Sequence, residues 1–244
     1  MRPRHEYEEV HRWLAWGLND CEISRLTNIP RKTIGEWRVR SRARLGTNCP
    51  RCEDVPLNEA TYAYLLGLYL GDGHIVKQRR IYSLRITLDE RYPGIIEECR
   101  RAIGSIRGGV AHAGIVQRSG CVSVVLGWNH WPCVFPQHGP GVKHARPMTL
   151  RSWQLGIADR HPDRLLRGLI HSDGWRGDNR VTVRGKTYAY PRYQFANHSE
   201  DIRAIFCRAC DVYGVRWRQM KWNTISIARK DDVAKLDVVV GLKK

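Results

Sequence analysis

The chain contains 244 residues, and its 41 Lys and Arg against 24 Asp and Glu give a formal charge of 41 − 24 = +17. Hydrophobic residues make up 42% of the chain, which is enough for an ordinary core and excludes a largely disordered protein. No apolar run approaches the roughly 20 residues of a membrane span, and the first residues form no apolar signal region. We therefore expect a cytoplasmic protein, associated with the nucleoid if the cell is bacterial, with no membrane partner.

The type of basic residue favours one class of partner. Arg accounts for 32 of the 41 basic residues. Its planar guanidinium can donate to two phosphate oxygens at once, whereas Lys is a point charge. Nucleic acid is therefore the expected partner, and a solvated basic surface or an anionic membrane is the alternative.

Charge and turn-forming residues divide the chain into parts. Residues 1–48 carry 10 basic and 6 acidic residues, or +4, whereas residues 60–244 carry 30 basic and 15 acidic residues, or +15. The stretch 46–56 between them is rich in turn formers and breaks helical periodicity. We predict a small domain over 1–48, a linker over 49–57 and a larger domain beyond it.

The small domain shows the pattern of three short helices, over 6–16, 21–27 and 31–38. Asn19 or Asp20 can cap the second helix, and a three-residue turn leads from it to the third. Two short helices around such a turn, the second rich in basic side chains, are typical of a helix-turn-helix.

The outer side of the third helix supplies the candidate contacts with DNA, while Ile23, Leu26 and Ile34 are expected to point inward. The segment resembles the helix-turn-helix of resolvase-like and sigma-region-four-like domains, and a plain three-helix bundle is the alternative. Alternating arginines after the third helix suit an arm that follows phosphates or a minor groove, or else a charged linker. The candidate DNA-binding residues here are Arg31, Lys32, Thr33, Arg38, Arg40 and Arg42.

One motif occurs twice, 101 residues apart. Leu65–Gly73 and Leu166–Gly174 each end an apolar helical run with Asp-Gly. Small residues stand four apart in both copies, so they share one helix face and let two helices approach closely. They are Gly67 and Gly71 in the first copy and Gly168 and Ser172 in the second. We predict a tight helix pair with the two terminal acids side by side.

These acids are Asp72 and Asp173. Neighbouring carboxylates repel unless a cation lies between them, and Mg²⁺ (or Mn²⁺) prefers oxygen ligands. With a phosphodiester substrate this arrangement indicates metal-assisted hydrolysis. A single copy would be better explained as a buried helix with a capping Asp, but the pattern occurs twice. We expect Gly73 and Gly174 to end the helices in the left-handed conformation.

Similar elements follow each copy. After the first come a predicted strand at 80–88, a helix at 93–103 and a strand at 121–128. After the second come strands at 180–184 and 190–196, a helix at 199–213, strands at 215–219 and 224–228, and a helix at 231–240. The predicted fold class is α+β: two pseudo-symmetric repeats of helix, two strands, helix, two strands and helix, behind a small all-α domain.

The motif and its surroundings resemble the LAGLIDADG (dodecapeptide) homing endonucleases in their monomeric, two-repeat form. The likeness covers about residues 58–242 and is most evident at Tyr64–Ile75 and Phe195–Ile202. It divides the larger domain into a first repeat over 58–142, a linker over 143–160 and a second repeat over 161–244.

The resemblance implies saddle-shaped, four-stranded antiparallel sheets that bind the major groove of double-stranded DNA. It also implies that Asp72 and Asp173 bind the catalytic metal, that no small molecule is the substrate, and that one chain acts as a monomer. Many members have an acid at the sixth motif position, where this chain has Leu70 and His171. Arg167 replaces a small residue at the second position of the second copy and should lie at a rim of the helix pair.

The resemblance further implies a polar or basic residue near the scissile phosphate, and Gln194 is the best candidate for it. Lys143 lies in the linker, which can follow phosphates, and Arg85 and Arg192 lie on matching strands where Arg can contact bases or backbone. The other catalytic candidates are Lys77, Lys143, Lys186 and Lys230. The alternative function is a transcriptional regulator that binds DNA without cutting it, since relatives of the family include such proteins.

The eight cysteines suggest thiols or metal ligands rather than a disulfide framework. Cys49 and Cys52 have the spacing of half a Zn²⁺ site. Cys207 and Cys210 have the same spacing, but on an apolar helix they are better explained as buried thiols. The other four, Cys21, Cys99, Cys121 and Cys133, are expected to fill the core.

Overall fold

The computed structural model describes residues 4–39, 48–53, 55–107 and 112–241. The chain forms two units, an N-terminal unit (Met1–Val55) and a repeat unit (Pro56–Lys244). The boundary between them falls inside the predicted linker 49–57. Arg40 and Arg42, two of the predicted DNA contacts, lie outside the described residues.

The described residues of the N-terminal unit include three helices: α1 (Arg4–Ala15), α2 (Asp20–Thr27) and α3 (Arg31–Val39). Asn19 caps α2 by accepting from the backbone N–H groups of Cys21 and Glu22, and the Glu22 carboxylate accepts from the Asn19 N–H in return. This reciprocal pair satisfies N–H groups that a helix start leaves without partners. Asn28, with φ of 56°, ends α2 and turns the chain towards α3.

A small core holds these helices together. Val10, Ile23, Ile29 and Ile34 are buried, as expected for Ile23 and Ile34. The prediction for Leu26 is wrong, because its side chain is 59% exposed. The inner stripe of the short helix α2 passes through Ile23 and the half-buried Thr27, four residues apart, and Leu26 lies beside that stripe.

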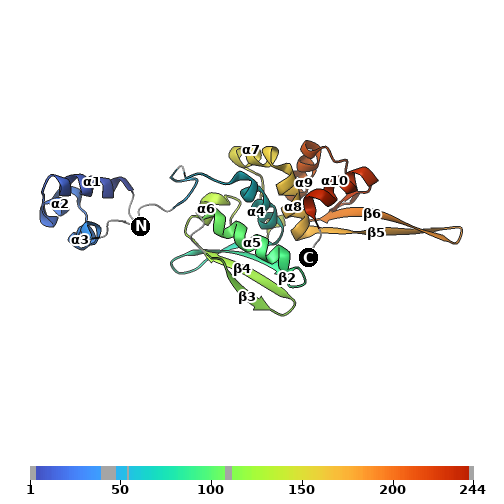
Figure 1. Ribbon diagram of the computed structural model, residues 1–244, viewed down its shortest axis with the longest axis horizontal. Coiled ribbons are helices and arrows are strands. Elements are labelled where there is room, and N and C mark those ends of the chain that lie inside the picture. Colours follow the sequence, from blue (N-terminus) through green and yellow to red (C-terminus); the bar gives the residue numbers. More distant parts are fainter. Residues whose placement is uncertain (1–3, 40–47, 54, 108–111, 242–244) are drawn as a thin grey trace. The chain divides into compact units, whose positions relative to one another are not determined.

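The repeat unit contains two runs of the same elements (Figure 1). The first run is α4 (Glu59–Asp72), β1 (Gly73–Lys77), β2 (Tyr82–Asp89), α5 (Pro93–Ile106), β3 (Gly114–Arg118), β4 (Cys121–Gly127) and α6 (Trp131–Val134). The second is α8 (Pro162–Asp173), β5 (Gly174–Val183), β6 (Lys186–Ala196), α9 (Glu200–Tyr213), β7 (Arg218–Lys221), β8 (Thr224–Ile227) and α10 (Lys230–Val240). A short 3₁₀ helix (Lys143–Ala145) and α7 (Ser152–Arg160) connect the runs.

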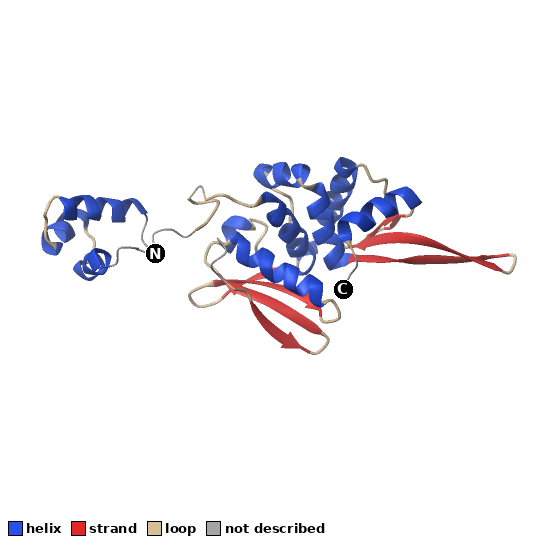
Figure 2. Ribbon diagram, viewed as in Figure 1, coloured by secondary structure: helices blue, strands red, loops and turns tan. Residues whose placement is uncertain are grey.

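Each run forms a four-stranded antiparallel sheet, with strand orders β1-β2-β4-β3 and β5-β6-β8-β7. The two orders are equivalent, so the predicted pair of repeats with antiparallel sheets is confirmed. The sequence pattern did not predict strands β1 and β3. In Figure 2 the helices lie on one side of the first sheet, and the β5–β6 hairpin projects well beyond its own sheet.

Helices α4 and α8 cross in close contact, as the small residues predicted. A Cβ added to Gly67 would lie 2.6 Å from the backbone nitrogen of Leu169, and one added to Gly168 would overlap the carbonyl oxygen of Tyr64. A Cβ on Gly71 would overlap the Ser172 side chain. The two backbones therefore touch, which only residues without bulky side chains allow.

The two motif glycines do not end their helices in the expected conformation. Gly73 (φ −89°, ψ 148°) and Gly174 (φ −93°, ψ 150°) are extended, and each is the first residue of a strand. Glycine is required there for space: a Cβ would lie 2.6 Å from the Cα of Tyr69 or 2.5 Å from the Cα of Ile170. The chain thus passes from helix to strand without a loop.

Arg167 joins distant parts of the repeat unit. It forms a two-pronged ion pair with Glu98 of α5, with N–O distances of 2.9 and 2.7 Å, and donates to the carbonyls of Val239 and Val240 in α10. Both side chains of the ion pair are largely shielded from solvent, and the Arg at this motif position ties the two repeats together.

No helix in the described chain is both long and apolar enough to span a bilayer.

We predict that Gly67→Ala will lower the free energy of unfolding by about 3 kcal/mol or more, because the new methyl group meets backbone that cannot move aside. Gly156→Ala in α7 is the control, since its Cβ meets only the end of the Arg160 side chain at 3.3 Å. Chemical denaturation of both variants checks this. A small loss for Gly67→Ala would mean that the helices can separate slightly at no great cost.

Candidate functional site

The two motif acids lie at equivalent ends of the crossed helices. Asp72 is the last residue of α4 and Asp173 the last residue of α8, and both side chains are half-buried. A Cβ on Gly71 would lie 3.0 Å from Oδ2 of Asp173, so the Asp173 carboxylate lies against the end of α4. The helix crossing therefore brings the two predicted metal ligands to one place.

Asn197 holds the second acid. Its Nδ2 donates to Oδ2 of Asp173 at 2.6 Å, and its Oδ1 accepts from the Ser199 backbone N–H at 2.8 Å. Because Ser199 also caps α9, the amide is fixed at both ends. Sequence reasoning missed this residue, although an Asn between a strand end and a helix cap was a usable signal.

Lys143 covers the end of α4. Its Nζ donates to the carbonyl oxygens of Tyr69, Leu70 and Gly71 at 2.6, 3.0 and 2.6 Å. The last carbonyls of a helix have no N–H partner within it, and a cation there also complements the helix dipole. Burial lowers the pKa of Lys143 to about 8, against the opposing effect of the Asp173 and Asp72 carboxylates.

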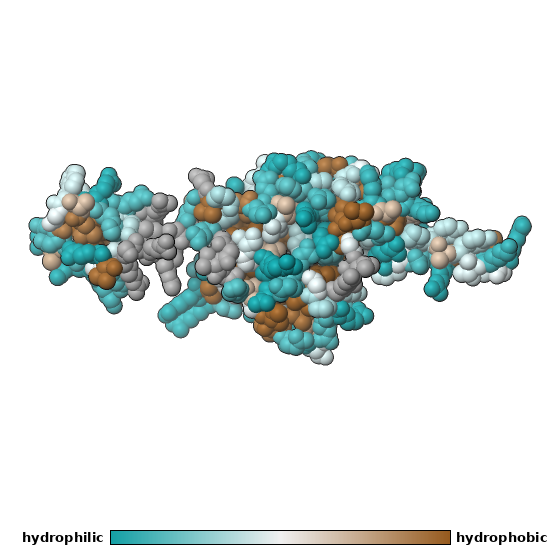
Figure 3. All heavy atoms as spheres, in the orientation of Figure 1, coloured by the Kyte–Doolittle hydropathy of each residue, from teal (hydrophilic) through white to brown (hydrophobic). Residues whose placement is uncertain are grey.

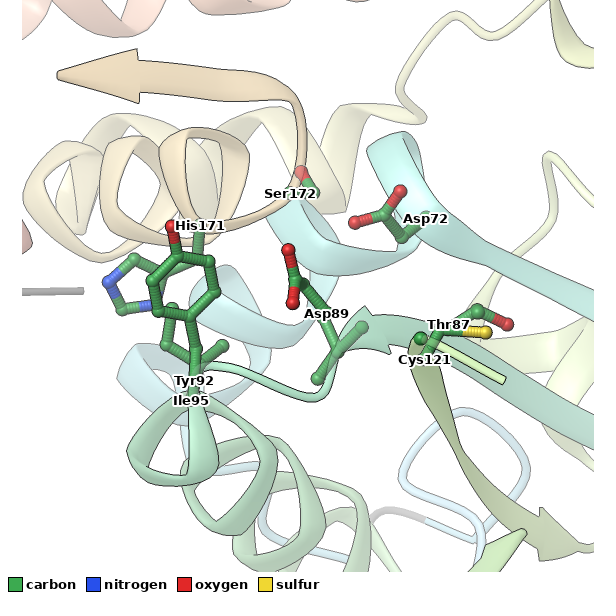
Figure 4. Close-up of a pocket in the computed structure, with 10 residues that line it drawn as sticks. Asp72, Thr87, Asp89, Tyr92, Ile95, Cys121, His171 and Ser172 are labelled. Carbon is green, nitrogen blue, oxygen red and sulfur yellow. The ribbon is translucent and has the colours of Figure 1, made fainter. Parts of the chain in front are cut away.

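A cavity of about 410 Å³ adjoins the first acid. Asp72, Thr87, Asp89 and Ser172 line it, and Figure 4 shows the carboxylates of Asp72 and Asp89 facing the same space beside Ser172. Asp89 is also paired with Arg91 at 2.5 Å. A ligand can thus reach the Asp72 carboxylate from this side, and carboxylate oxygens are the ligands that Mg²⁺ and Mn²⁺ prefer.

The sixth motif position has a structural role in this chain. His171 is buried; its Nδ1 is hydrogen-bonded with the Tyr64 hydroxyl at 3.1 Å, and its Nε2 donates to the Val240 carbonyl at 3.0 Å. Both ring nitrogens therefore have partners. Leu70, the equivalent residue of the first copy, is fully buried.

The strand candidates lie on equivalent strands. Gly73 pairs with Ile86 and Gly174 with Phe195, so the register makes Gln194 on β6 the counterpart of Arg85 on β2. Gln194 and Arg192 are half-buried, and both contact the Met220 sulfur, at 3.7 and 3.8 Å. The remaining basic candidates are exposed at the ends of elements: Lys77 in β1, Lys186 in β6 and Lys230 in α10.

The candidates of the N-terminal unit lie on α3. Arg31 and Lys32 are exposed and Thr33 is half-buried. Arg38 is exposed as well and pairs with Asp20 at 2.6 Å. The first turn of α3 therefore presents two basic side chains to solvent.

Comparison with known proteins finds solved structures that align with this chain at low sequence identity. No protein-family model matches the sequence, and no curated protein does. Mesophilic variants of the homing endonuclease I-DmoI align with a TM-score of 0.47 and 14% identity, over 75% of this chain and 95% of theirs. I-DmoI in complex with DNA and Mn aligns at 0.48 and 14%, over 75% and 98%. A mutant of I-SmaMI aligns at 0.48 and 10%, over 76% and 86%.

We predict a pH-dependent contribution of Lys143 to stability. Its folded pKa of about 8 lies below the ordinary 10.5, so the unfolded chain holds more protons between these values and stability rises with pH there. The free energy of unfolding of the wild type relative to Lys143→Met should therefore increase from pH 8 to 10.5, by at most about 3 kcal/mol. Urea unfolding at several pH values measures it.

Lys77→Met, at an exposed position, is the matched control and should show no such trend. A difference between the wild type and Lys143→Met that stays constant with pH would contradict the prediction.

Proposed function

We propose that this protein is a sequence-specific DNA endonuclease of the LAGLIDADG type, which hydrolyses phosphodiester bonds of duplex DNA with a divalent metal. One observation carries the proposal: two carboxylates, Asp72 and Asp173, end two helices that touch through glycine, at the start of two equivalent antiparallel sheets. Residues 60–244, which hold this arrangement, carry a charge of 30 − 15 = +15, and that suits a polyanionic substrate.

Asp72 and Asp173 would hold Mg²⁺ or Mn²⁺, since each ends one of the two touching helices and offers carboxylate oxygens. When bound, the ion would lower the pKa of water and stabilise negative charge on the leaving oxygen. Asn197 orients the Asp173 carboxylate through its 2.6 Å hydrogen bond. Lys143 keeps a positive charge beside both acids, which limits their mutual repulsion while no metal is bound. Gln194 is proposed to position the attacking water.

Strands β2 and β6 and the long β5–β6 hairpin are proposed to contact the duplex. Arg85 and Arg192 lie on these strands and can bind base edges or phosphates. The hairpin tip carries exposed Arg180, Arg184 and Lys186, and the turn residue Arg184 has a φ of 50°. Figure 3 shows mainly hydrophilic and neutral side chains over this projecting ribbon, as a surface for DNA requires.

Helix α3 is proposed as a second reading element, a helix-turn-helix recognition helix. The exposed Arg31 and Lys32 at its start suit contacts with base edges or phosphates. Because both repeats belong to one chain, we further propose that the protein acts as a monomer. Genomic DNA is the proposed substrate, so we propose that the protein acts inside the cell.

We predict that Asp72→Asn or Asp173→Asn will reduce DNA cleavage by at least about 100-fold, a typical loss when a group that stabilises the transition state is removed. The substrate is a library of genomic fragments incubated with Mg²⁺, and sequencing of the new ends maps the breaks. Discrete double-strand breaks are expected with the wild type.

Asp163→Asn is the matched control, because it alters a carboxylate in the first turn of the same helix α8. It should cut like the wild type. Specific binding without any breaks, unchanged by the motif substitutions, would exclude the nuclease and favour a transcriptional regulator.

For the N-terminal unit, we predict that Arg31→Ala combined with Lys32→Ala will weaken DNA binding and lower the slope of log affinity against log salt by about 1 for each phosphate that is no longer bound. Binding titrations at several salt concentrations measure this. Arg12→Ala, at an exposed position of α1, is the control. Cleavage at saturating protein should persist in the double variant, and its loss would place α3 in the catalytic machinery instead.

A further inference from the structure

One face of the β5–β6 hairpin carries all of its exposed large apolar side chains. Cross-strand partners in an antiparallel pair point to the same side, and the register of this pair is continuous from Gly174–Phe195 to Val183–Lys186. Odd-numbered residues of β5 therefore share a face with even-numbered residues of β6. The exposed apolar and aromatic side chains of the hairpin all belong to this side, which we call the apolar face: Trp175, Val181, Val183, Tyr188 and Tyr190.

The opposite face of the hairpin packs against helices at its base. Phe195 stacks on Phe206 of α9 with ring centroids 4.3 Å apart, and the Tyr193 hydroxyl donates to Asp237 of α10 at 2.6 Å. Because side chains alternate along a strand, the apolar face looks away from these helices. The hairpin also projects beyond them (Figure 2), so within the described chain the apolar face near the tip stays open to solvent.

Contacts within the apolar face fix its shape. The rings of Tyr188 and Tyr190 are stacked, with centroids 6.4 Å apart and planes 19° from parallel. Val181 is the cross-strand partner of Tyr188, and the Trp175 ring lies over Gly177, where a Cβ would overlap it. Aromatic and β-branched pairs of this kind stabilise a two-stranded ribbon. A surface that is ordered in advance loses little conformational freedom when it binds.

Charge and position favour duplex DNA as the partner of this face. Arg184 and Lys186 at the tip are exposed, and Arg192 and Gln194 lie on the apolar face nearer its base. Strand β5 begins directly after Asp173, so a duplex held at that acid would run onto the ribbon. The major groove of DNA admits a two-stranded ribbon, and Arg and Gln are side chains that bond to base edges there.

We propose that the apolar face recognises thymine through its C5-methyl group in the major groove. This methyl is the apolar group that the bases present there, and it is read by apolar side chains. Val181 and Val183 offer methyl groups to it, and Tyr188 and Tyr190 offer rings. The inference rests on the DNA binding proposed above, and it adds which base the second repeat favours.

The length of the ribbon places the favoured thymines. Val181 and Val183 follow Asp173 by 181 − 173 = 8 and 183 − 173 = 10 positions, or about 26 and 33 Å at ~3.3 Å per residue. At ~3.4 Å per base pair this reach covers about 8 to 10 base pairs, and fewer where the ribbon crosses the groove at an angle. We therefore expect thymines about 5 to 10 base pairs from the cleaved bonds, on the side bound by the second repeat.

Replacement of thymidine by deoxyuridine tests this, because it removes the methyl group and keeps every hydrogen-bonding group of the base pair. The full-length protein first selects preferred duplexes from a random library without divalent metal, so that binding occurs without cleavage. Thymines should be enriched in the window above. Deoxyuridine there should weaken binding about fourfold for each methyl group contacted, the value of one buried methyl. Deoxyuridine outside the protected region is the control and should change nothing.

A pair of substitutions assigns the effect to the hairpin. Val181→Ser combined with Val183→Ser should weaken binding to the thymine duplex and remove most of the response to deoxyuridine, as coupled partners do in a double-mutant cycle. The matched control is Val212→Ser combined with Val238→Ser, at valines exposed on α9 and α10, and it should keep the full response. A loss of folded protein would lower binding to both duplexes alike, whereas a lost methyl contact changes their ratio.

Specific binding that ignores deoxyuridine in the window would overturn the inference and leave the DNA-binding function standing. Failure to select any preferred duplex would overturn both. A full deoxyuridine response in the Val181→Ser, Val183→Ser protein would assign thymine recognition to other residues and also overturn the inference. A dimer in sedimentation experiments that this variant dissociates would do the same, because the apolar face would then bind a second copy of the chain.

Discussion

Helices α4 and α8 touch backbone to backbone because Gly67 and Gly168 place no side chain at their crossing. This contact aligns the two helix ends, and the chain then enters a strand at once through Gly73 and Gly174. Both sheets therefore start from the same point as the two carboxylates. A bulkier residue at the crossing would separate the acids and shift each sheet relative to the other, since packed interiors transmit such strain.

The backbones of the two repeats match, but the side chains around the acids do not. Asp173 is held by Asn197 from its own repeat, whereas the end of α4 is covered by Lys143 from the segment between the repeats. On the strands, Arg85 stands at the position that Gln194 holds in the other half. A single chain can differentiate its halves in this way, while a dimer of identical subunits cannot.

Two side chains of the second motif copy have clear packing roles. His171 bridges Tyr64 of α4 and Val240 of α10. Arg167 pairs with Glu98 and also reaches α10. Both side chains fasten the C-terminal helix to the helix pair.

The sequence by itself determined the parts of this protein that local pattern encodes. The duplicated motif predicted the helix pair and the paired acids, and periodicity predicted most helices and strands. Tertiary structure alone decided which distant groups meet: Lys143 with the end of α4, and Arg167 with Glu98 and α10. The contacts of Lys143 join residues 70 or more positions apart, and no spacing rule along the chain records a proximity that only folding creates.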